Sequence, residues 1–179
     1  MPQENYPVLA PGHILRKLES PFVYDIIKDD LYELDEEAFN FLLKCDGKNP
    51  ISNIPNYYES TQTIDFMLDE RILIMKKGDD HRKIKNPASS IPSLRYLLLN
   101  ISDKCNITCK HCYLGNPGNL EMDIGTFENV VSQFEDMGGL KLMISGGEPL
   151  LHSRFWELME ILPSYDLRVV ILSDGTLID

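Results

Sequence analysis

The sequence has 179 residues, of which 43% are hydrophobic and 25% are charged, as in a globular protein with one medium domain or two small ones. The formal net charge is −11 and both halves are acidic, so neither half offers the basic face that a nucleic acid requires. No apolar run approaches the roughly 20 residues that span a bilayer, and the first residues are polar and acidic, unlike a signal peptide. These features argue against nucleic-acid and membrane partners and predict a cytoplasmic protein.

The first part of the sequence predicts a small α+β domain. Residues 1–12 contain prolines and a glycine and are interpreted as an irregular arm. Short runs rich in aromatic and β-branched residues predict strands at 13–19, 22–27 and 31–34, and the domain closes with a strand at 73–77.

Helical patterns lie between the third and the last of these strands. Asp35 can cap a helix. Four residues then follow with the spacing of one helix face: Ala38, Phe41, Leu42 and Cys45. This spacing points Cys45 into a core, so its thiol is interpreted as a small buried hydrophobic group. A short helix at 51–58, interrupted by Pro55, and a helix from Thr63 complete the domain.

This order of strands and helices is a winged-helix pattern. Residues 7–77 resemble the leader-peptide recognition domain of peptide-modifying systems, the type related to the pyrroloquinoline-quinone peptide chaperone, through the stretches Tyr32–Ala38 and Cys45–Gly47. The resemblance implies that the domain binds an extended peptide by adding a strand to a sheet edge, which we expect at Leu31–Leu34, next to the helix at 64–72. A winged-helix domain that only packs on its neighbour is the alternative, and the acidic balance disfavours DNA binding.

The second part of the sequence predicts an α/β domain at 94–179, after a linker at 78–93 that is rich in charges, prolines and serines. An apolar run at 94–101 predicts a strand that is buried on both faces. A helix capped by Asp123 or Thr126 follows. The remaining elements are a strand, a helix and a strand at 140–145, 151–162 and 167–172. The βαβαβ order predicts right-handed crossovers and a parallel sheet.

Three cysteines follow the first strand of this domain with the spacing C-x3-C-x2-C: Cys105, Cys109 and Cys112. On one short loop, this spacing can bring together three thiolates, which suit a soft metal or an iron–sulfur cluster. A closed structural site normally has four protein ligands, so three leave one coordination position open for chemistry. Zinc with His111 as the fourth ligand is the alternative, which is disfavoured because His111 and Cys112 are adjacent and reach one ion with poor geometry.

A second motif, Ser145–Pro149 (SGGEP), follows the next strand. Glycines at a strand end let the backbone approach a ligand closely, and Pro149 suits the start of a helix. The two motifs, in this order and each at a strand end, resemble the radical S-adenosylmethionine (SAM) superfamily. The resemblance implies the first βαβαβ part of a partial (β/α) barrel, a [4Fe–4S] cluster on the three cysteines, and SAM at the free iron as the source of a 5′-deoxyadenosyl radical.

The same resemblance implies which residues contact SAM. Gly146, Gly147 and Glu148 would meet its methionyl amino group. Tyr113, directly after the third cysteine, would lie near the adenine through its backbone. All four residues belong to the loops that follow the first two strands of the domain.

The third strand of the domain ends at Ser173 and Asp174, where the family often has Thr-Asn-Gly. The departure keeps a hydroxyl and a carbonyl-type side chain, so we expect a ligand contact there, with a solvated turn as the alternative. The family's barrel has more βα units than this sequence predicts before Asp179. We therefore expect the N-terminal part of a longer enzyme, or a truncated product.

Together, the two domains predict a radical SAM enzyme that matures a peptide. The resemblance implies a precursor leader peptide as partner and a flavodoxin or ferredoxin as electron donor. The alternatives are a truncated peptide- or cluster-binding module without turnover, and a radical SAM enzyme of small-molecule cofactor biosynthesis whose first domain is only structural.

Overall fold

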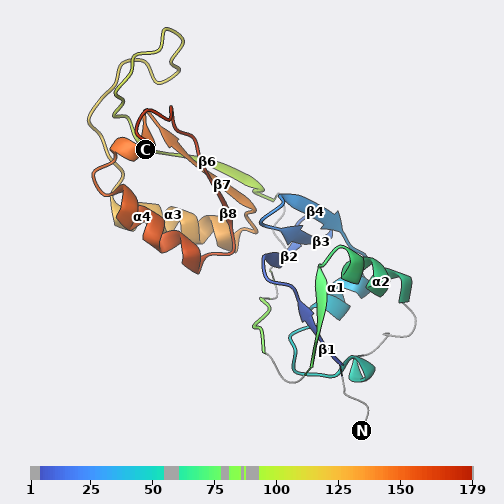
Figure 1. Ribbon diagram of the computed structural model, residues 1–179. Coiled ribbons are helices and arrows are strands. Elements are labelled where there is room, and N and C mark those ends of the chain that lie inside the picture. The colour runs from blue at the N-terminus through green and yellow to red at the C-terminus, as the bar shows by residue number, and fades with distance from the viewer. Residues whose placement is uncertain (1–4, 55–60, 78–80, 86, 88–92, 179) are drawn as a thin grey trace. The chain divides into compact units, whose positions relative to one another are not determined.

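The computed structural model divides the chain into two compact units, Met1–Pro92 and Ser93–Asp179 (Figure 1). The residues that it describes are 5–54, 61–77, 81–85, 87 and 93–178. Both units contain strands and helices, and each has its own hydrophobic core, so the predicted mixed α/β character is confirmed. None of the described helices is long and apolar enough to span a bilayer.

The first unit is built on two small antiparallel sheets. β1 (Asn5–Leu9) pairs with β5 (Leu73–Lys77), while β2 (His13–Lys17), β3 (Pro21–Asp25) and β4 (Asp30–Glu33) form a meander in that order. In the part of the chain that the structure describes, β4 pairs with β3 and with no strand on its other side.

The helices of this unit, α1 (Glu36–Leu42) and α2 (Thr61–Asp69), contribute to the core that the sheets enclose. Asp35 caps α1 as predicted, because its carboxylate accepts the Ala38 N–H at 2.7 Å. The helix ends earlier than its apolar spacing predicts, and Cys45 lies beyond its last turn. The prediction that Cys45 is buried is confirmed, since its side chain has no exposed surface.

The prediction of an irregular arm at 1–12 is wrong for residues 5–9, which form β1. Val8 and Leu9 are buried, and the partner of Leu9 in the sheet is Leu73. This pairing joins residues that are far apart in the sequence, so local composition does not indicate it. Only the 3-10 turn Ile51–Asn53 occupies the start of the predicted helix at 51–58, whose residues 55–58 lie outside the described residues.

Part of the predicted linker at 78–93 packs onto the first unit. The guanidinium of Arg82 donates to the carbonyls of Leu9 at 2.6 Å, His13 at 2.8 Å and Ala10. Ile84 packs against the core of the unit. The segment around Arg82 is therefore fastened to the connection between β1 and β2.

The second unit is a three-stranded parallel sheet with two long helical connections. β6 (Tyr96–Ser102), β7 (Lys141–Gly146) and β8 (Arg168–Ile171) lie in that order, and α3 (Ile124–Asp136) and α4 (Phe155–Ile161) connect them. The predicted βαβαβ order is confirmed.

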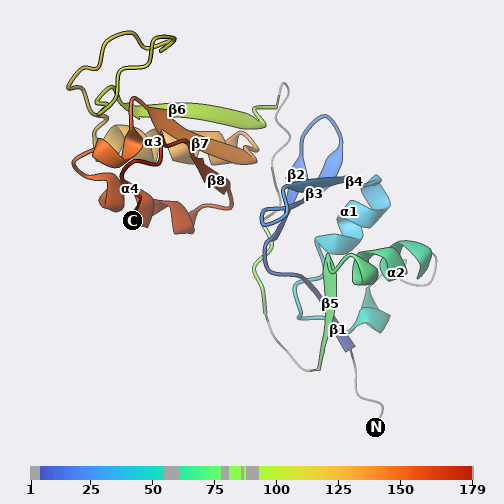
Figure 2. The same ribbon diagram turned by 45° about the horizontal axis from the view of Figure 1, so that its top comes forward.

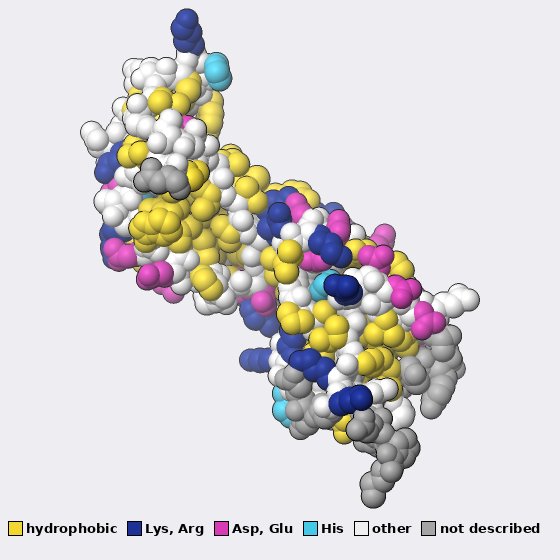
Figure 3. All heavy atoms as spheres, in the orientation of Figure 1, with side chains coloured by type: hydrophobic (Ala, Val, Ile, Leu, Met, Phe, Trp, Pro, Cys, Tyr) yellow, Lys and Arg dark blue, Asp and Glu magenta, His cyan; other side chains and the backbone are white. Residues whose placement is uncertain are grey.

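Both helices cover the same face of this sheet (Figure 2), and the core lies between the two layers. Its fully buried side chains include Phe127, Val131, Leu142, Ile144 and Leu158. The prediction that the first strand is buried on both faces is wrong among the described residues, because alternate side chains of a strand point to opposite faces. Tyr96 and Leu98 are 58% and 48% exposed. Hydrophobic side chains also gather on the surface of this unit in Figure 3.

Candidate functional site

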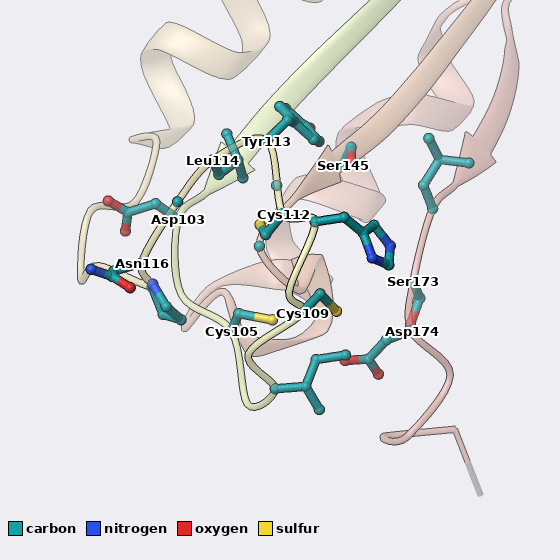
Figure 4. Close-up of a pocket in the computed structure, with 17 residues that line it drawn as sticks. Asp103, Cys105, Cys109, Cys112, Tyr113, Leu114, Asn116, Ser145, Ser173 and Asp174 are labelled. Carbon is teal, nitrogen blue, oxygen red and sulfur yellow. The ribbon is translucent and has the colours of Figure 1, made fainter.

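Three segments gather at one edge of the parallel sheet, because the carboxyl ends of parallel strands lie together. They are the cysteine loop (residues 103–120) after β6, the turn Gly146–Pro149 after β7, and Ser173 and Asp174 after β8. All three segments contribute to the lining of one cavity of about 320 Å³ (Figure 4). The predicted site residues are thus drawn from all three strands of the sheet.

The base of the cysteine loop closes on itself. The N–H of Asp103 donates to the Leu120 carbonyl at 3.2 Å, and the N–H of Leu120 donates to the Asp103 carboxylate at 2.6 Å. The N–H of Gly118 donates to the Asp103 carbonyl at 3.0 Å, and a Cβ at Gly118 would overlap the Asp103 carboxylate. The two ends of the cysteine loop are therefore held together by hydrogen bonds to a single residue, Asp103.

The three cysteines of the loop line the cavity with free thiols, and Figure 4 shows them around the same hollow. Cys105 is half-buried, whereas Cys109 and Cys112 are exposed and are joined by a turn bond from the Cys112 N–H to the Cys109 carbonyl at 3.1 Å. His111, the alternative zinc ligand, lines the cavity too. Within the described residues, no three Cys, His, Asp or Glu side chains stand as a ready-made metal site. This result concerns side chains that converge on a single ion. An iron–sulfur cluster binds each cysteine at a different iron and does not need such convergence.

The glycines after β7 allow their turn to pack closely against the base of the cysteine loop. Gly146 has φ +154°, and a Cβ there would overlap the Ser102 carbonyl, while a Cβ on Gly147 would overlap the Lys104 carbonyl. The N–H groups of Gly147 and Glu148 donate to those carbonyls at 2.8 and 2.7 Å. Both glycines also line the cavity. Because these two residues have no side chain, the two loops can approach closely, and backbone atoms are exposed next to the cavity.

Glu148 differs from the glycines, because its side chain is fully buried and the lining residues of the cavity do not include it. Its carboxylate accepts the Leu150 N–H at 2.9 Å, the Ser173 hydroxyl at 3.0 and 3.1 Å, and the Asp174 N–H at 2.8 Å. The side chain therefore ties the turn after β7 to the end of β8. Its contact with the amino group of SAM stays a prediction.

Ser173 and Asp174 line the cavity from the end of β8. The Asp174 carboxylate accepts the Thr176 N–H at 2.8 Å and its hydroxyl at 2.7 Å, and the hydrogen bonds from Thr176 hold the pKa of Asp174 below its usual value. The Asn106 amide donates to the Thr176 hydroxyl oxygen at 2.6 Å. The cysteine loop and the turn after β8 are therefore linked by a side-chain hydrogen bond.

Tyr113 also lines the cavity, is 71% exposed, and donates its hydroxyl to the Asn100 side-chain oxygen at 3.3 Å. The lining residues that the sequence-based site predictions do not single out include Asp103, Asn116 and Leu172. For Asp103, the signal is its place at the end of the strand, two residues before the first cysteine. For Asn116 and Leu172, no local pattern distinguishes them.

A charged group that the sequence analysis does not single out lies beside the base of the loop. The Glu121 carboxylate accepts the Lys104 ammonium at 2.8 Å, the Ser153 N–H at 2.6 Å and the Ser153 hydroxyl at 2.7 Å. The hydrogen bonds from Lys104 and then from Ser153 lower the pKa of Glu121 to about 2. Glu121 is therefore a carboxylate across the physiological pH range.

Comparison with known proteins finds a family match within the second unit. Residues 99–179 match the Radical SAM superfamily. The chain is 22% identical over 161 residues to the subtilosin biosynthesis protein AlbA of Bacillus subtilis, a match that covers 81% of this chain and 36% of AlbA. It is 30% identical over 88 residues to the PqqA peptide cyclase of Gluconobacter oxydans, with 46% and 24% covered. It is 27% identical over 90 residues to an AdoMet-dependent heme synthase of Oleidesulfovibrio alaskensis, with 49% and 23% covered.

A solved structure extends the likeness in fold over both units. SuiB of Streptococcus suis, crystallised with its precursor peptide SuiA, superposes with a TM-score of 0.66 at 16% identity, over 97% of this chain and 44% of SuiB. SuiB bound to S-adenosylmethionine superposes with a TM-score of 0.60. The chain spans less than half the length of SuiB, and 23–36% of the length of the three relatives above.

The family match and the cavity coincide. The matched segment begins in β6 and contains the cysteine loop, the glycines after β7 and the end of β8. The AlbA match is longer than either unit, so it covers parts of both. Residues 99–179, which include the cysteine loop, the glycine turn and the end of β8 around this cavity, thus match the Radical SAM superfamily.

Proposed function

We propose that this chain is the part of a radical SAM enzyme that holds a [4Fe–4S] cluster through Cys105, Cys109 and Cys112 and receives SAM in the adjoining cavity. One observation carries the proposal: the three thiols line the same cavity as the glycine turn and the end of β8. The donor set fits the group, because thiolates are the usual ligands of iron–sulfur clusters. Three such ligands leave one iron for a ligand that is not protein.

When bound, the cluster and SAM supply a 5′-deoxyadenosyl radical that abstracts hydrogen from a substrate. The contribution of the chain is to bind and orient these groups. Gly146 and Gly147 offer bare backbone for the methionyl amino group, next to Glu148. Tyr113 flanks the position of the adenine, and the end of β8 closes the other side of the cavity with Asp174 and its neighbouring serine, Ser173. A flavodoxin or ferredoxin supplies the electron, and a cytoplasmic location keeps the thiols reduced.

For the first unit we propose recognition of the leader of a precursor peptide by a winged-helix-like domain at 7–77, separated by 78–93 from the radical SAM part at 94–179. β4 offers an edge for strand addition, since the described strands leave its outer side unpaired. The Tyr32 ring of β4 contacts the Phe66 ring of α2 edge-on, with 6.1 Å between centroids, and Phe66 is 48% exposed. These rings form an aromatic surface beside the edge. The bound precursor peptide of SuiB and the name of AlbA, a bacteriocin biosynthesis protein, support the same partner.

A second function is favoured by one observation. The similarity to a heme synthase, 27% identity over 90 residues, is comparable to the similarity to the PqqA peptide cyclase. In that case the cavity would serve the same cofactors, and the first unit would bind no leader. Binding of a peptide or cluster without turnover is the remaining alternative.

The cluster is tested by anaerobic reconstitution of the full chain with iron and sulfide. We expect a brown protein with about four irons per chain, the content of one [4Fe–4S] cluster. Addition of SAM should then change the electron paramagnetic resonance spectrum of the reduced protein. Stoichiometric zinc without iron uptake would support the zinc alternative instead.

The peptide partner is tested by titrating the full chain with synthetic leader peptides encoded beside its gene. We expect binding without cluster or SAM, weakened by salt because the unit is acidic. Phe66→Ala should weaken it by about tenfold, as for an aromatic anchor. Trp156→Ala removes an exposed aromatic from the other unit and should leave binding unchanged. Absence of binding would leave the first unit as a packing module.

A further inference from the structure

We infer that Glu121 is a positioning residue for the cysteine loop. With Lys104 and Ser153 it fixes the backbone directly before Cys105, so that the first thiolate is set in place while the loop beyond it can adjust. This inference rests on the proposed function, because it concerns how the loop presents its ligands to a cluster.

Lys104, the residue before the first cysteine, is held by its side chain and by both of its backbone groups. Its ammonium lies 2.8 Å from the Glu121 carboxylate. Its N–H donates to the Ser102 hydroxyl at 3.1 Å, and its carbonyl accepts the Glu148 N–H at 2.7 Å. The absent Cβ of Gly147 leaves the space that this carbonyl occupies. The backbone position directly before the first cysteine is therefore fixed by three contacts.

Glu121 joins three parts of the unit at that point. One carboxylate oxygen accepts both the Lys104 ammonium and the Ser153 N–H, and the other accepts the Ser153 hydroxyl. The backbone of Glu121 forms an isolated bridge with Ser102 at the end of β6. The start of the loop, its end and the segment leading into α4 (Phe155–Ile161) are thus connected through a single carboxylate. Hydrogen bonds of this charged type are roughly twice as strong as neutral ones.

The other two cysteines have a different setting. Cys109 and Cys112 are exposed, and the backbone bonds recorded for them stay within the loop: Cys112 donates to Cys109 and accepts from Gly115. The outer part of the loop, which carries these two cysteines, therefore has fewer contacts with the rest of the unit than the backbone before Cys105. Ordering this outer part beside a fixed Cys105 costs less conformational entropy than ordering three mobile ligands.

The test compares thiol reactivity in the full chain without metal. Reduced, iron-free protein is treated with iodoacetamide, and alkylation of each cysteine is followed by mass spectrometry. In Glu121→Gln and in Lys104→Met we expect Cys105 to react roughly tenfold faster, as after loss of a hydrogen bond to a charged group. One change removes a negative charge near the thiol and the other a positive charge, so acceleration in both variants cannot come from the local charge alone. Cys109 and Cys112 should keep their wild-type rates.

Two variants control for general loosening. Lys104→Arg keeps the cation opposite Glu121 and should restore the wild-type rate at Cys105. Glu157→Gln breaks the exposed ion pair with Arg154, which measures 2.7 Å, and should change none of the three rates. Equal acceleration at all three cysteines, or no acceleration at Cys105 in both Glu121→Gln and Lys104→Met, would overturn the inference.

A second measurement applies to reconstituted protein. Glu121→Gln should load as much iron as the wild type and release it to a chelator roughly tenfold faster, by the same loss. Equal release rates would contradict the inference. If the wild type takes up no iron, the proposed function fails, whereas the alkylation experiment still decides whether Glu121 positions Cys105.

Discussion

The cysteines of the two units have opposite surroundings. Cys45 in the first unit is fully buried, its thiol donates to the Phe41 carbonyl at 3.3 Å, and burial raises its pKa well above the usual value. Cys109 and Cys112 in the second unit are exposed beside a cavity on an irregular loop. The contrast shows that the same side chain acts as a small hydrophobic group where a core encloses it, and is accessible to solvent where it lies on an irregular loop beside a cavity.

The largest expected effect tests that contrast directly. Replacing Cys105, Cys109 or Cys112 by Ala should abolish iron uptake on reconstitution, because the remaining two thiolates cannot hold the cluster. Cys45→Ala should leave the iron content unchanged and lower the free energy of unfolding of the first unit by about 1 kcal/mol, as for a trimmed core side chain. Iron analysis and urea unfolding measure the two effects. Loss of iron in Cys45→Ala would show that the division into core and ligand cysteines is wrong.

A smaller effect is expected where the glycine turn meets the loop. Gly147→Ala should destabilise the second unit by about 2–3 kcal/mol, because the new methyl group would overlap the Lys104 carbonyl, which is backbone and cannot simply turn away. Iron uptake should fall as well, since the same shift would displace the start of the cysteine motif.

The matched control is Gly125→Ala in α3 (Ile124–Asp136). There the new methyl group would only approach the Asp123 side chain, and alanine favours the helix. Urea unfolding of both variants checks the difference. Equal stability of Gly147→Ala and the wild type would mean that the turn is not closely packed on the loop.

The smallest effect concerns pH and the first unit. His13 is 6% exposed, with its ring 3.6 Å from the Asp25 carboxylate, and burial lowers its pKa despite the opposing effect of Asp25. The unfolded chain takes up this proton near pH 6.5, whereas the folded chain does so at a lower pH. Stability from the neutral imidazole should therefore be lost as the pH falls from 6.5 toward the folded pKa.

Urea unfolding between pH 7.5 and 5.5 measures this dependence. His13→Leu should have a flatter profile than the wild type over that range. His81→Leu, at an exposed histidine, should keep the wild-type profile. A wild-type profile in His13→Leu would show that another group causes the dependence.

The elements of the second unit could be predicted from sequence because their signals are local. The helix cap at Asp123 and the alternation of apolar strands with amphipathic helices are short-range patterns, and both appear in the structure. The exposed face of β6 could not be predicted in the same way. An apolar run indicates burial, but it does not reveal that both connecting helices lie on one side of the sheet.

The candidate site shows the same limit. Spacing alone predicts three cysteine ligands, and the structure brings these three cysteines to one cavity. Spacing does not reveal the partners of the two carboxylates at the site. Glu148 accepts a hydrogen bond from Ser173, and Glu121 accepts one from Lys104. Each contact joins residues that are well separated in the sequence. Such contacts depend on tertiary packing, and so does the pairing of β1 with β5 in the first unit.

The hydrogen bonds of Arg82 determine where a stable fragment of the first unit can end. An expressed fragment that stopped at the last residue of the final strand, Lys77, would remove the donor of three backbone carbonyls around the first turn of the unit. Buried or half-buried acceptors left without partners cost about 1–3 kcal/mol each. Fragments, fusions and chimeras of the first unit should therefore extend at least through Ile84, which also contributes to its core.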